Sequence, residues 1–424
     1  MKAIQKKLTT VLLLIVSAFS ANAQYFIEDT TFYFPEWSEG RMLEIINDTL
    51  VIAGGFETVG LNNDTVNHIV KWDGINFHAM GSGNTNWENV FSGIAYQGYE
   101  YYCGGFHSMG NVPQTHSIAG WDGSQYFSIG DCASANFYDI VVWHDTLFVG
   151  GDVGTIEGHT YFGIAAYNGT YWIDVGILDS PRALAVYNDQ VYAVGGSAQM
   201  ERYLGGTSWE SIGTTGFYGK DLVVDTINNF LYTTAGATAG SFGNIFYTDG
   251  IALWNGFYWE KVGYGYGTTN PGTNCLAIYR GDIYISPGND SVGGVFTGRL
   301  ARWDGQNWFM VGDYPGLKYG VGDLKVYKDE LYLGGVIHIN GTDTLGWGVV
   351  RWYMPPDTTC KYLKPRVFTE NNLDTFYMSG GQAEVQFFNN NAYVQTWDWD
   401  FGDTGSGTVK DPVHIYTDTG TYNV

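Results

Sequence analysis

One short phrase recurs along most of the chain, at intervals of about fifty residues. Its clearest copy, LARWDGQNWFMVG at Leu300–Gly312, has two short apolar segments joined by a tight Asp-Gly turn, with a tryptophan on each side. Similar copies precede it, and the first aromatic recurs once more after it. These first aromatics are Trp72, Trp121, Tyr167, Tyr203, Trp254, Trp303 and Trp352. Such a period is the signature of a repeat architecture, in which each repeat forms one supersecondary unit.

A second recurring segment precedes each copy and completes the repeat unit. It reads LAVYNDQVYAVGG at Leu184–Gly196 and LKVYKDELYLGG at Leu324–Gly335. Apolar residues alternate on both sides of a short polar turn, which predicts a β-hairpin. The unit is therefore a meander of four strands, A to D, and the glycine pair after strand B indicates a crowded backbone or a positive φ. A repeated four-stranded meander is the pattern of a β-propeller.

The number of repeats predicts an all-β fold with a seven-bladed propeller, with six or eight blades left open. Aromatic residues make up 17% of the chain and helical periodicity is almost lacking, which favours strands throughout. The seventh repeat begins at Val321 and stops at Tyr353 without its strand D, because MPPDTTC follows. We expect the segment Thr30–Gly40, TTFYFPEWSEG, to supply that strand and close the ring, although Glu36 stands where other copies carry an aromatic.

Residues 24–353 resemble the kelch-type propellers, in which a Gly-Gly pair is followed by two spaced aromatics in each blade. The chain departs from that pattern in two blades, where Ala235-Gly236 and Pro287-Gly288 replace the glycine pair. Its Asp-Gly turn between the aromatics is also unusually regular. The resemblance concerns the architecture and implies no particular ligand.

The repeat disappears before the C-terminal part of the chain. After a linker at 354–364, residues 365–424 contain WDWDFGDTGSG and then DPVHIYTDTGTYNV. This run resembles a PKD domain, an immunoglobulin-like β-sandwich whose hallmarks are WDFGDG, P-x-H-x-Y and GTY-x-V; only Thr404 departs from them. The resemblance implies a further strand after Val424, so we expect an incomplete sandwich here. Similar exported proteins often end in a sorting domain for type IX secretion.

Residues 1–23 read as a secretory signal peptide. Lys2, Lys6 and Lys7 precede the apolar run VLLLIVSAF, which ends in ANA before Gln24. The run is too short to span a bilayer, so we expect no membrane insertion. Its removal would leave 17 basic against 43 acidic side chains. Because phosphate binding needs a basic surface, this balance argues against a nucleic-acid partner and favours a secreted or cell-surface protein.

Strand parity predicts one propeller face on which function would sit. The B–C loops and D–A links lie at one end of the meander and the tight A–B and C–D turns at the other. The B–C and D–A connections are longer and vary in length, so we expect function on their face. The candidate ligand-binding residues on that face are Trp87, His107, His159, Tyr264, Tyr266 and His338. Three loop histidines would allow a copper site, as in oxidases built on kelch-like propellers. We favour surface residues on separate blades, because no HxxxH or paired-carboxylate motif accompanies them.

Two smaller patterns concern metals and cysteines. Asp398, Asp400 and Asp403 alternate along the C-terminal module and could hold calcium, although solvated strand and turn residues are the favoured interpretation. No other cofactor is expected. The four cysteines lack the CxxC spacing of zinc sites, and export would permit disulfides in any of three pairings. They are Cys103, Cys132, Cys275 and Cys360.

No catalytic constellation stands out in the sequence. We therefore expect a non-catalytic binding or adhesion protein whose propeller face contacts an extracellular glycan or protein, with the PKD-like module as a spacer. The alternative is a carbohydrate-active enzyme or a copper oxidase with its site on the B–C loop face. An enzyme would need several polar or titratable side chains that converge at the central mouth of that face.

Overall fold

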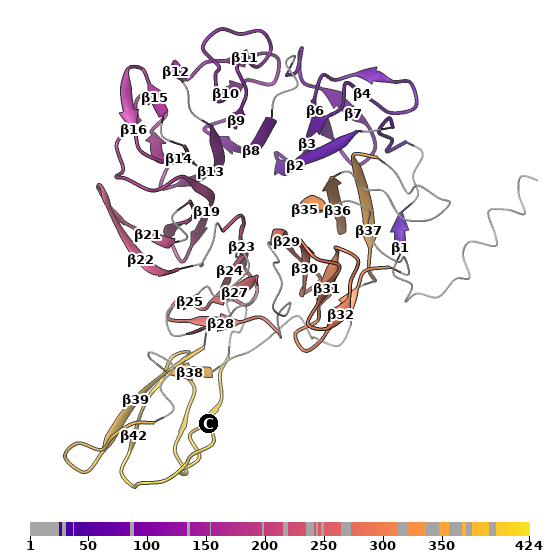
Figure 1. Ribbon diagram of the computed structural model, residues 1–424. Coiled ribbons are helices and arrows are strands. Elements are labelled where there is room, and N and C mark those ends of the chain that lie inside the picture. The colour runs from indigo at the N-terminus through magenta and orange to yellow at the C-terminus, as the bar shows by residue number, and fades with distance from the viewer. Residues whose placement is uncertain are drawn as a thin grey trace, which may run out of the picture.

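Seven antiparallel sheets of four strands stand around a central opening (Figure 1). The computed structural model describes residues 25–424 apart from 28–30, 37, 85–88, 134–135, 153, 197–198, 215–218, 235–240, 243–244, 247–249, 264–272, 313–319, 336–346, 356–366, 370–374 and 390–395. Within these residues, no helix is long and apolar enough to cross a membrane. The chain is therefore a seven-bladed β-propeller, as its seven aromatic positions predict.

Each blade is a meander whose strands A to D follow one another in the sheet, and blade 7 takes its strand D from the start of the chain. Blade 1 is β2 (Glu39–Ile46), β3 (Thr49–Gly55), β6 (Ile69–Trp72) and β7 (Phe77–Ala79); blade 2 is β8 (Asn89–Tyr96), β9 (Tyr99–Gly105), β10 (Ile118–Trp121) and β11 (Tyr126–Phe127); blade 3 is β13 (Phe137–Trp143), β14 (Thr146–Gly151), β17 (Ile164–Tyr167) and β18 (Trp172–Ile173). Blade 4 is β19 (Pro181–Tyr187), β20 (Gln190–Gly195), β21 (Gln199–Gly205) and β22 (Ser208–Thr214); blade 5 is β23 (Leu222–Asp225), β24 (Phe230–Thr234), β27 (Ile251–Trp254) and β28 (Trp259–Lys261). Blade 6 is β29 (Thr273–Tyr279), β30 (Asp282–Pro287), β33 (Ala301–Trp303) and β34 (Trp308–Met310); blade 7 is β35 (Val321–Tyr327), β36 (Glu330–Gly335), β37 (Val349–Tyr353) and β1 (Tyr25–Ile27).

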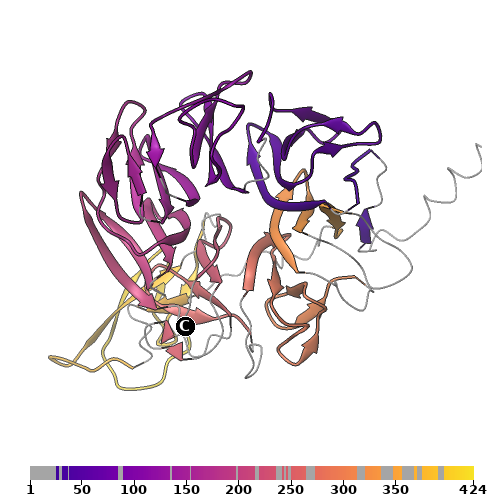
Figure 2. The same cartoon turned by 45° about the horizontal axis from the view of Figure 1, so that its top comes forward.

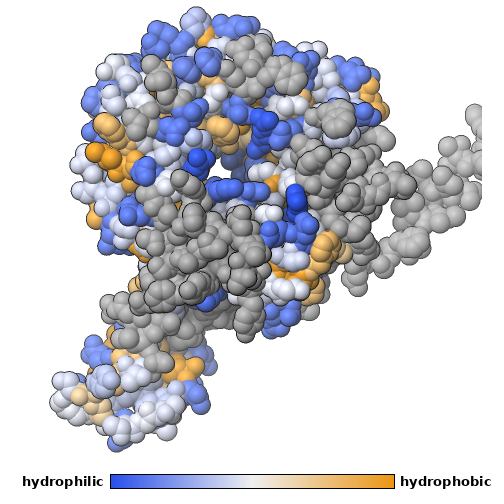
Figure 3. All heavy atoms as spheres, viewed as in Figure 1, coloured by the Kyte–Doolittle hydropathy of each residue, from blue (hydrophilic) through white to orange (hydrophobic). Residues whose placement is uncertain are grey.

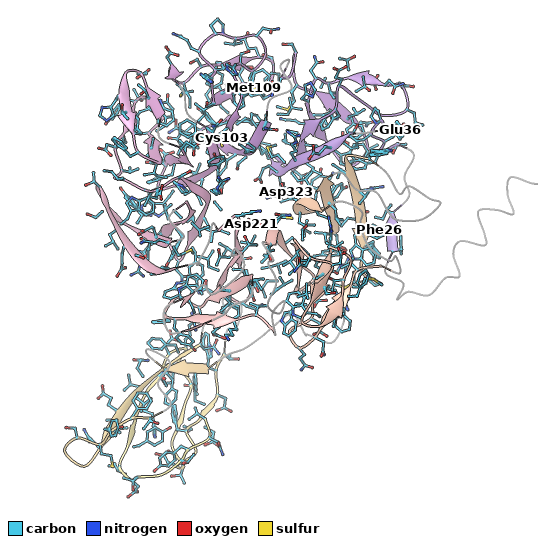
Figure 4. The ribbon with its side chains drawn as sticks, in the orientation of Figure 1. Phe26, Glu36, Cys103, Met109, Asp221 and Asp323 are labelled. Carbon is cyan, nitrogen blue, oxygen red and sulfur yellow. The ribbon has the colours of Figure 1, made fainter. Side chains whose placement is uncertain are left out.

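The ring is closed by β1, and the expectation that Thr30–Gly40 would do so is wrong. Tyr25 pairs with Tyr353 in the ladder between β1 and β37, and the ring of Phe26 packs edge-on against Trp352 at 4.8 Å between centroids. Figure 4 shows Phe26 beside blade 7, away from Glu36. Phe32 and Phe34 of the 30–40 segment are buried between blades 7 and 1 instead, in one cluster with Tyr332. Glu36 is exposed because its segment does not pair in the sheet.

The recurring aromatics explain why the chain repeats one phrase. The strand D tryptophans of blades 3, 4 and 5 donate their indole N–H to a carbonyl of the preceding blade, as Trp172 does to Ile129 at 2.8 Å. Tyrosines at the end of strand A donate their hydroxyl to the A–B turn of the next blade, as Tyr187 does to the Asn229 carbonyl at 2.8 Å. The same bonds recur for Trp209, Trp259, Tyr96, Tyr279 and Tyr327. In these blades, strand D therefore bonds to the preceding blade or strand A bonds to the next one.

Short hairpins decorate the outer parts of several blades. β12 (Cys132–Ala133), β15 (Gly154–Ile156) and β16 (His159–Tyr161) form a three-stranded sheet beside blade 3. Two-stranded sheets are formed by β4 (Thr58–Val59) with β5 (Asp64–Thr65), β25 (Ser241–Phe242) with β26 (Ile245–Phe246), and β31 (Ser291–Val292) with β32 (Val295–Phe296).

The C-terminal residues form a smaller group of strands beside blade 5 (Figure 2). One sheet has β38 (Val367–Thr369), β39 (Ala383–Asn389) and β42 (Val413–Tyr416), and β40 (Trp399–Asp400) pairs with β41 (Ser406–Gly407). Their core contains Val385, Phe387, Trp399, Phe401 and Tyr416, as the alternation of apolar and acidic residues predicts for one buried strand face. Phe388 contacts Phe257 of the blade 5 C–D turn, with 4.6 Å between ring centroids.

Candidate binding site at the central channel

The centre of the ring contains a cavity of about 890 Å³, lined by strand A residues from all seven blades. Figure 3 shows the corresponding hollow with hydrophilic residues at its rim. Strand A begins where a D–A link ends, so the first residues of β2, β8, β13, β19, β29 and β35 lie toward the face that carries the B–C loops. This volume falls within the range of small-molecule sites, roughly 300–1,000 Å³.

Acidic side chains occupy one repeat position of strand A in blades 3, 5 and 7. Asp139, Asp221 and Asp323 each accept a hydrogen bond from a backbone N–H in strand A of the next blade. The donors are Leu184, Leu276 and Leu43, at 2.7, 2.7 and 2.6 Å. Asp139 also accepts a bond from the Ser92 hydroxyl of blade 2 at 2.7 Å. These carboxylates therefore connect neighbouring blades, and Figure 4 shows Asp221 and Asp323 beside the central opening.

The same acids share the channel with one ammonium group. The Lys325 ammonium lies 2.7 Å from the Glu44 carboxylate, across the junction of blades 7 and 1. Glu44 and Asp323 together raise the pKa of Lys325 despite its burial. Burial raises the pKa of Asp323 to about 8, that of Asp139 to about 7 and that of Asp221 to about 6. The channel wall is thus rich in hydrogen-bonding groups that are already partnered.

Basic and aromatic side chains occupy the position just before these acids, nearer the loop face. Arg41, Arg182 and Lys220 are exposed there, and Phe91 and Tyr138 are half-buried. The Arg182 guanidinium lies 4.6 Å from the centroid of the Tyr138 ring, and the Phe91 and Tyr138 rings are 5.6 Å apart. We call these five residues the channel mouth. In a chain of net charge −23, it is a local concentration of positive charge.

The structure places the predicted loop residues away from this channel where it describes them. His107 is exposed and its ring stacks on that of His116, with 4.9 Å between centroids. His159 is exposed on β16 and contacts the Tyr161 ring. Neither histidine lines the cavity. Trp87, Tyr264, Tyr266 and His338 lie outside the described residues.

The proposed calcium ligands have other partners or face solvent. The Asp403 carboxylate lies 2.8 Å from His414 Nε2 and accepts a bond from the Gly405 N–H. Asp400 accepts a bond from the Gly402 N–H, and Asp398 is exposed. Across the described ranges, no group of three or more His, Cys, Asp or Glu residues is arranged to hold a metal ion. Cys103, Cys132 and Cys275 are buried free thiols, and Cys360 lies outside the described residues.

Sequence reasoning missed the channel mouth because it sought binding residues in the variable B–C loops and D–A links and not on strand A. The five mouth residues occupy equivalent strand A positions in blades 1 to 5, where blades 6 and 7 carry Asn274 and Gly322. Core positions such as the first aromatic keep one residue type in nearly all blades. A repeat position whose residue type changes from blade to blade is the signal that would have indicated a surface facing the channel.

The raised pKa values of Asp139, Asp221 and Asp323 predict that the protein becomes less stable as the pH rises. Their folded-state pKa values lie above the ordinary value near 4, so their stabilising contribution is complete below pH ~4 and is lost as the pH rises through about 6 to 8. Burial lowers the pKa of His68, so this histidine makes the protein more stable as the pH rises through about 6. It is one group, whereas three carboxyls act in the other direction. Between pH 5.5 and 8.5 we expect the melting temperature to fall by several degrees in scanning calorimetry. Asp323→Asn should flatten this slope, and a slope of the opposite sign would contradict the prediction.

Comparison with known proteins supports the fold alone. No family model matches the chain, and no curated protein matches it. The extracellular domain of BT4673 from B. thetaiotaomicron aligns with 86% of this chain at 13% identity and a TM-score of 0.51; the match spans 46% of that protein's length. YCF48, solved bound to D1 peptide, aligns with 80% of this chain and 97% of its own at 14% identity and a TM-score of 0.50. At these identities the chain is similar to both in its propeller fold.

Proposed function

We propose that the chain is an exported, non-catalytic binding protein that presents the loop face of its propeller to a ligand outside the cell. In this proposal residues 1–23 are a signal peptide, residues 24–353 are a kelch-like propeller, and 365–424 are a PKD-like spacer after the linker at 354–364. The protein is secreted or displayed at the cell surface, and type IX secretion would deliver it. The apolar run before Gln24 and the net charge of −23 support export and disfavour a nucleic-acid partner.

The observation that supports a binding role is the contrast between the hydrogen-bonded acids inside the channel and the exposed groups at its mouth. The carboxylates that an enzyme would need are engaged by backbone N–H groups of neighbouring blades, as Asp323 is by Leu43. The exposed basic and aromatic groups lie instead at the mouth, where a ligand would arrive. A site with partnered acids inside and exposed recognition groups outside is suited to hold a ligand rather than to transform it.

The solved structures with a similar fold add a modest argument for a binding role outside the cell. One similar propeller is an extracellular domain and another was solved bound to a peptide. The ligand of this chain would accordingly be an extracellular glycan or protein, with calcium an optional addition at Asp398, Asp400 and Asp403. In this proposal the loop residues Trp87, His107, His159, Tyr264, Tyr266 and His338 would add ligand contacts separate from the mouth.

We expect the purified mature chain to bind a glycan or protein saturably and without turnover. The measurement is a binding screen against polysaccharides and extracellular proteins, with and without calcium and copper, followed by product analysis of each binder. Loss of binding on replacing Trp87 or Tyr266 by alanine would support the proposed surface. Turnover of a glycan that disappears in His107→Ala or His338→Ala would overturn the non-catalytic assignment in favour of an enzyme.

A further inference from the structure

The channel mouth has the features of a site for a negatively charged group. Arg182 and Lys220 come from adjacent blades, and both are exposed. Partial desolvation by the surrounding protein and, after it, the nearby charge of Arg182 lower the pKa of the Lys220 ammonium. Lys220 donates a hydrogen bond to the neutral Asn274 side chain at 2.7 Å. A bound anion would therefore reduce the repulsion between two like charges.

The acids near the mouth offset this charge only in part. Asp152 interacts electrostatically with Arg182, and it accepts bonds from the Tyr138 hydroxyl at 2.9 Å and the Ser180 hydroxyl at 2.8 Å. Arg182 contributes to lowering the pKa of Asp152. Arg41, on blade 1, pairs with the Glu39 carboxylate at 2.8 Å. Arg182 and Lys220 come from adjacent blades and are exposed at the mouth, so they are the cations that a ligand would engage.

The rest of the channel indicates what the charged group would be attached to. The half-buried rings of Phe91 and Tyr138 offer apolar surface beside the cations. Sugars pack well against aromatic rings because the C–H groups of the sugar contact the electron-rich face of the ring. Deeper in the cavity, Glu44 and Lys325 pair with each other but stay partly exposed, so their remaining acceptor and donor sites can form hydrogen bonds with hydroxyls. Each uronic-acid residue carries one carboxylate among several hydroxyls and therefore matches the cations and these groups together, whereas an acidic peptide segment offers carboxylates without those hydroxyls.

We propose that the channel mouth binds an acidic glycan, with a uronic-acid carboxylate on Arg182 and Lys220 and sugar hydroxyls directed into the channel. This inference rests on the proposed binding function and specifies its ligand class. Charge-assisted bonds to a carboxylate are about twice as strong as neutral ones, so they would dominate affinity. The overall negative charge of the protein opposes non-specific attraction of polyanions, so binding would have to come from this local site.

The test is calorimetric titration of the mature chain with oligogalacturonides and with neutral galacto-oligosaccharides of equal length, in a chelator so that no cation bridges the partners. The site variant is Arg182→Gln with Lys220→Gln, and the matched control is Lys261→Gln with Lys410→Gln, which changes the net charge equally at exposed positions outside the channel. We expect at least a tenfold loss of oligogalacturonide affinity in the site variant, none in the control, and no binding of neutral sugars. Melting curves check that both variants fold.

Three results would overturn the assignment. One is equal binding of oligogalacturonides by the site variant and the control, and another is equal binding of neutral and acidic sugars. The third is a peptide with a free C-terminal carboxylate that binds in an Arg182- and Lys220-dependent way while no uronic-acid oligomer does. In each of these cases a ligand is still bound, so the proposed binding function survives. Failure of every glycan and protein to bind would overturn both.

Discussion

Replacing Gly54 with alanine is expected to lower the melting temperature by roughly 10 °C or to prevent folding, because the clash costs several kcal/mol. An alanine Cβ at this position would lie 1.9 Å from the Glu39 carbonyl oxygen and 3.0 Å from the Gly40 Cα. These atoms belong to strand A of the same blade, where the register between β2 and β3 shifts at Gly40. The backbone cannot move aside without breaking that ladder.

The adjacent glycine gives a matched control. A Cβ at Gly55 would meet no atom closer than 3.7 Å, and neither glycine has a positive φ. We expect Gly55→Ala to melt within about 2 °C of the wild type, since surface substitutions without a clash change stability by about 0.5 kcal/mol or less. Equal melting of the two variants would contradict the close approach as the reason for the repeated glycine. Gly104, Gly151 and Gly195 show the same approach to strand A in blades 2, 3 and 4.

Removing residues 24–27 from a chain that starts at Gln24 is expected to lower the melting temperature by about 5 °C or more and to promote aggregation, because it takes β1 from blade 7. The deletion removes the ladder from Tyr25 to Tyr353 and from Ile27 to Arg351. It also exposes Trp352, which Phe26 covers. The bare edge of β37 would then be available to another chain.

A point variant separates the strand from its side chains. Tyr25 is 50% exposed, so Tyr25→Ser keeps the backbone ladder and loses little packing. Thermal melts and light scattering of this variant should resemble those of the wild type, in contrast to the deletion. A truncated chain that melts at the wild-type temperature and stays monomeric would show that the ring does not depend on β1.

The repeated aromatics and turns predicted the fold to the level of blade number and strand order. The closing strand was placed wrongly because β1 has only three residues, too few for periodicity to be visible. The aromatic-rich 30–40 segment imitated a strand, whereas Phe32 and Phe34 fill the space between two blades. Local residue types cannot tell those two forms of burial apart.

The candidate site was harder to predict than the fold. Its residues come from strand A of successive blades, so their proximity is a property of the closed ring and not of any local motif. Arg41 and Lys220 illustrate this, since both line one cavity although they belong to blades 1 and 5. The sequence directed attention to loops that vary in length, such as those carrying His107 and His159. Those two side chains are exposed on separate blades.

The pairing of β1 with β37 also governs the order in which the molecule can be assembled. The first strand of the propeller to be synthesised is the last to find its place, because its partner follows nearly the whole propeller in the sequence. Loop-closure entropy grows only slowly with length, so the finished pairing is not weak, but contacts this distant form late and slowly. During that interval each molecule exposes one free strand and one free sheet edge that are complementary. At high local concentration, the same complementarity that completes one ring can link two molecules by strand exchange.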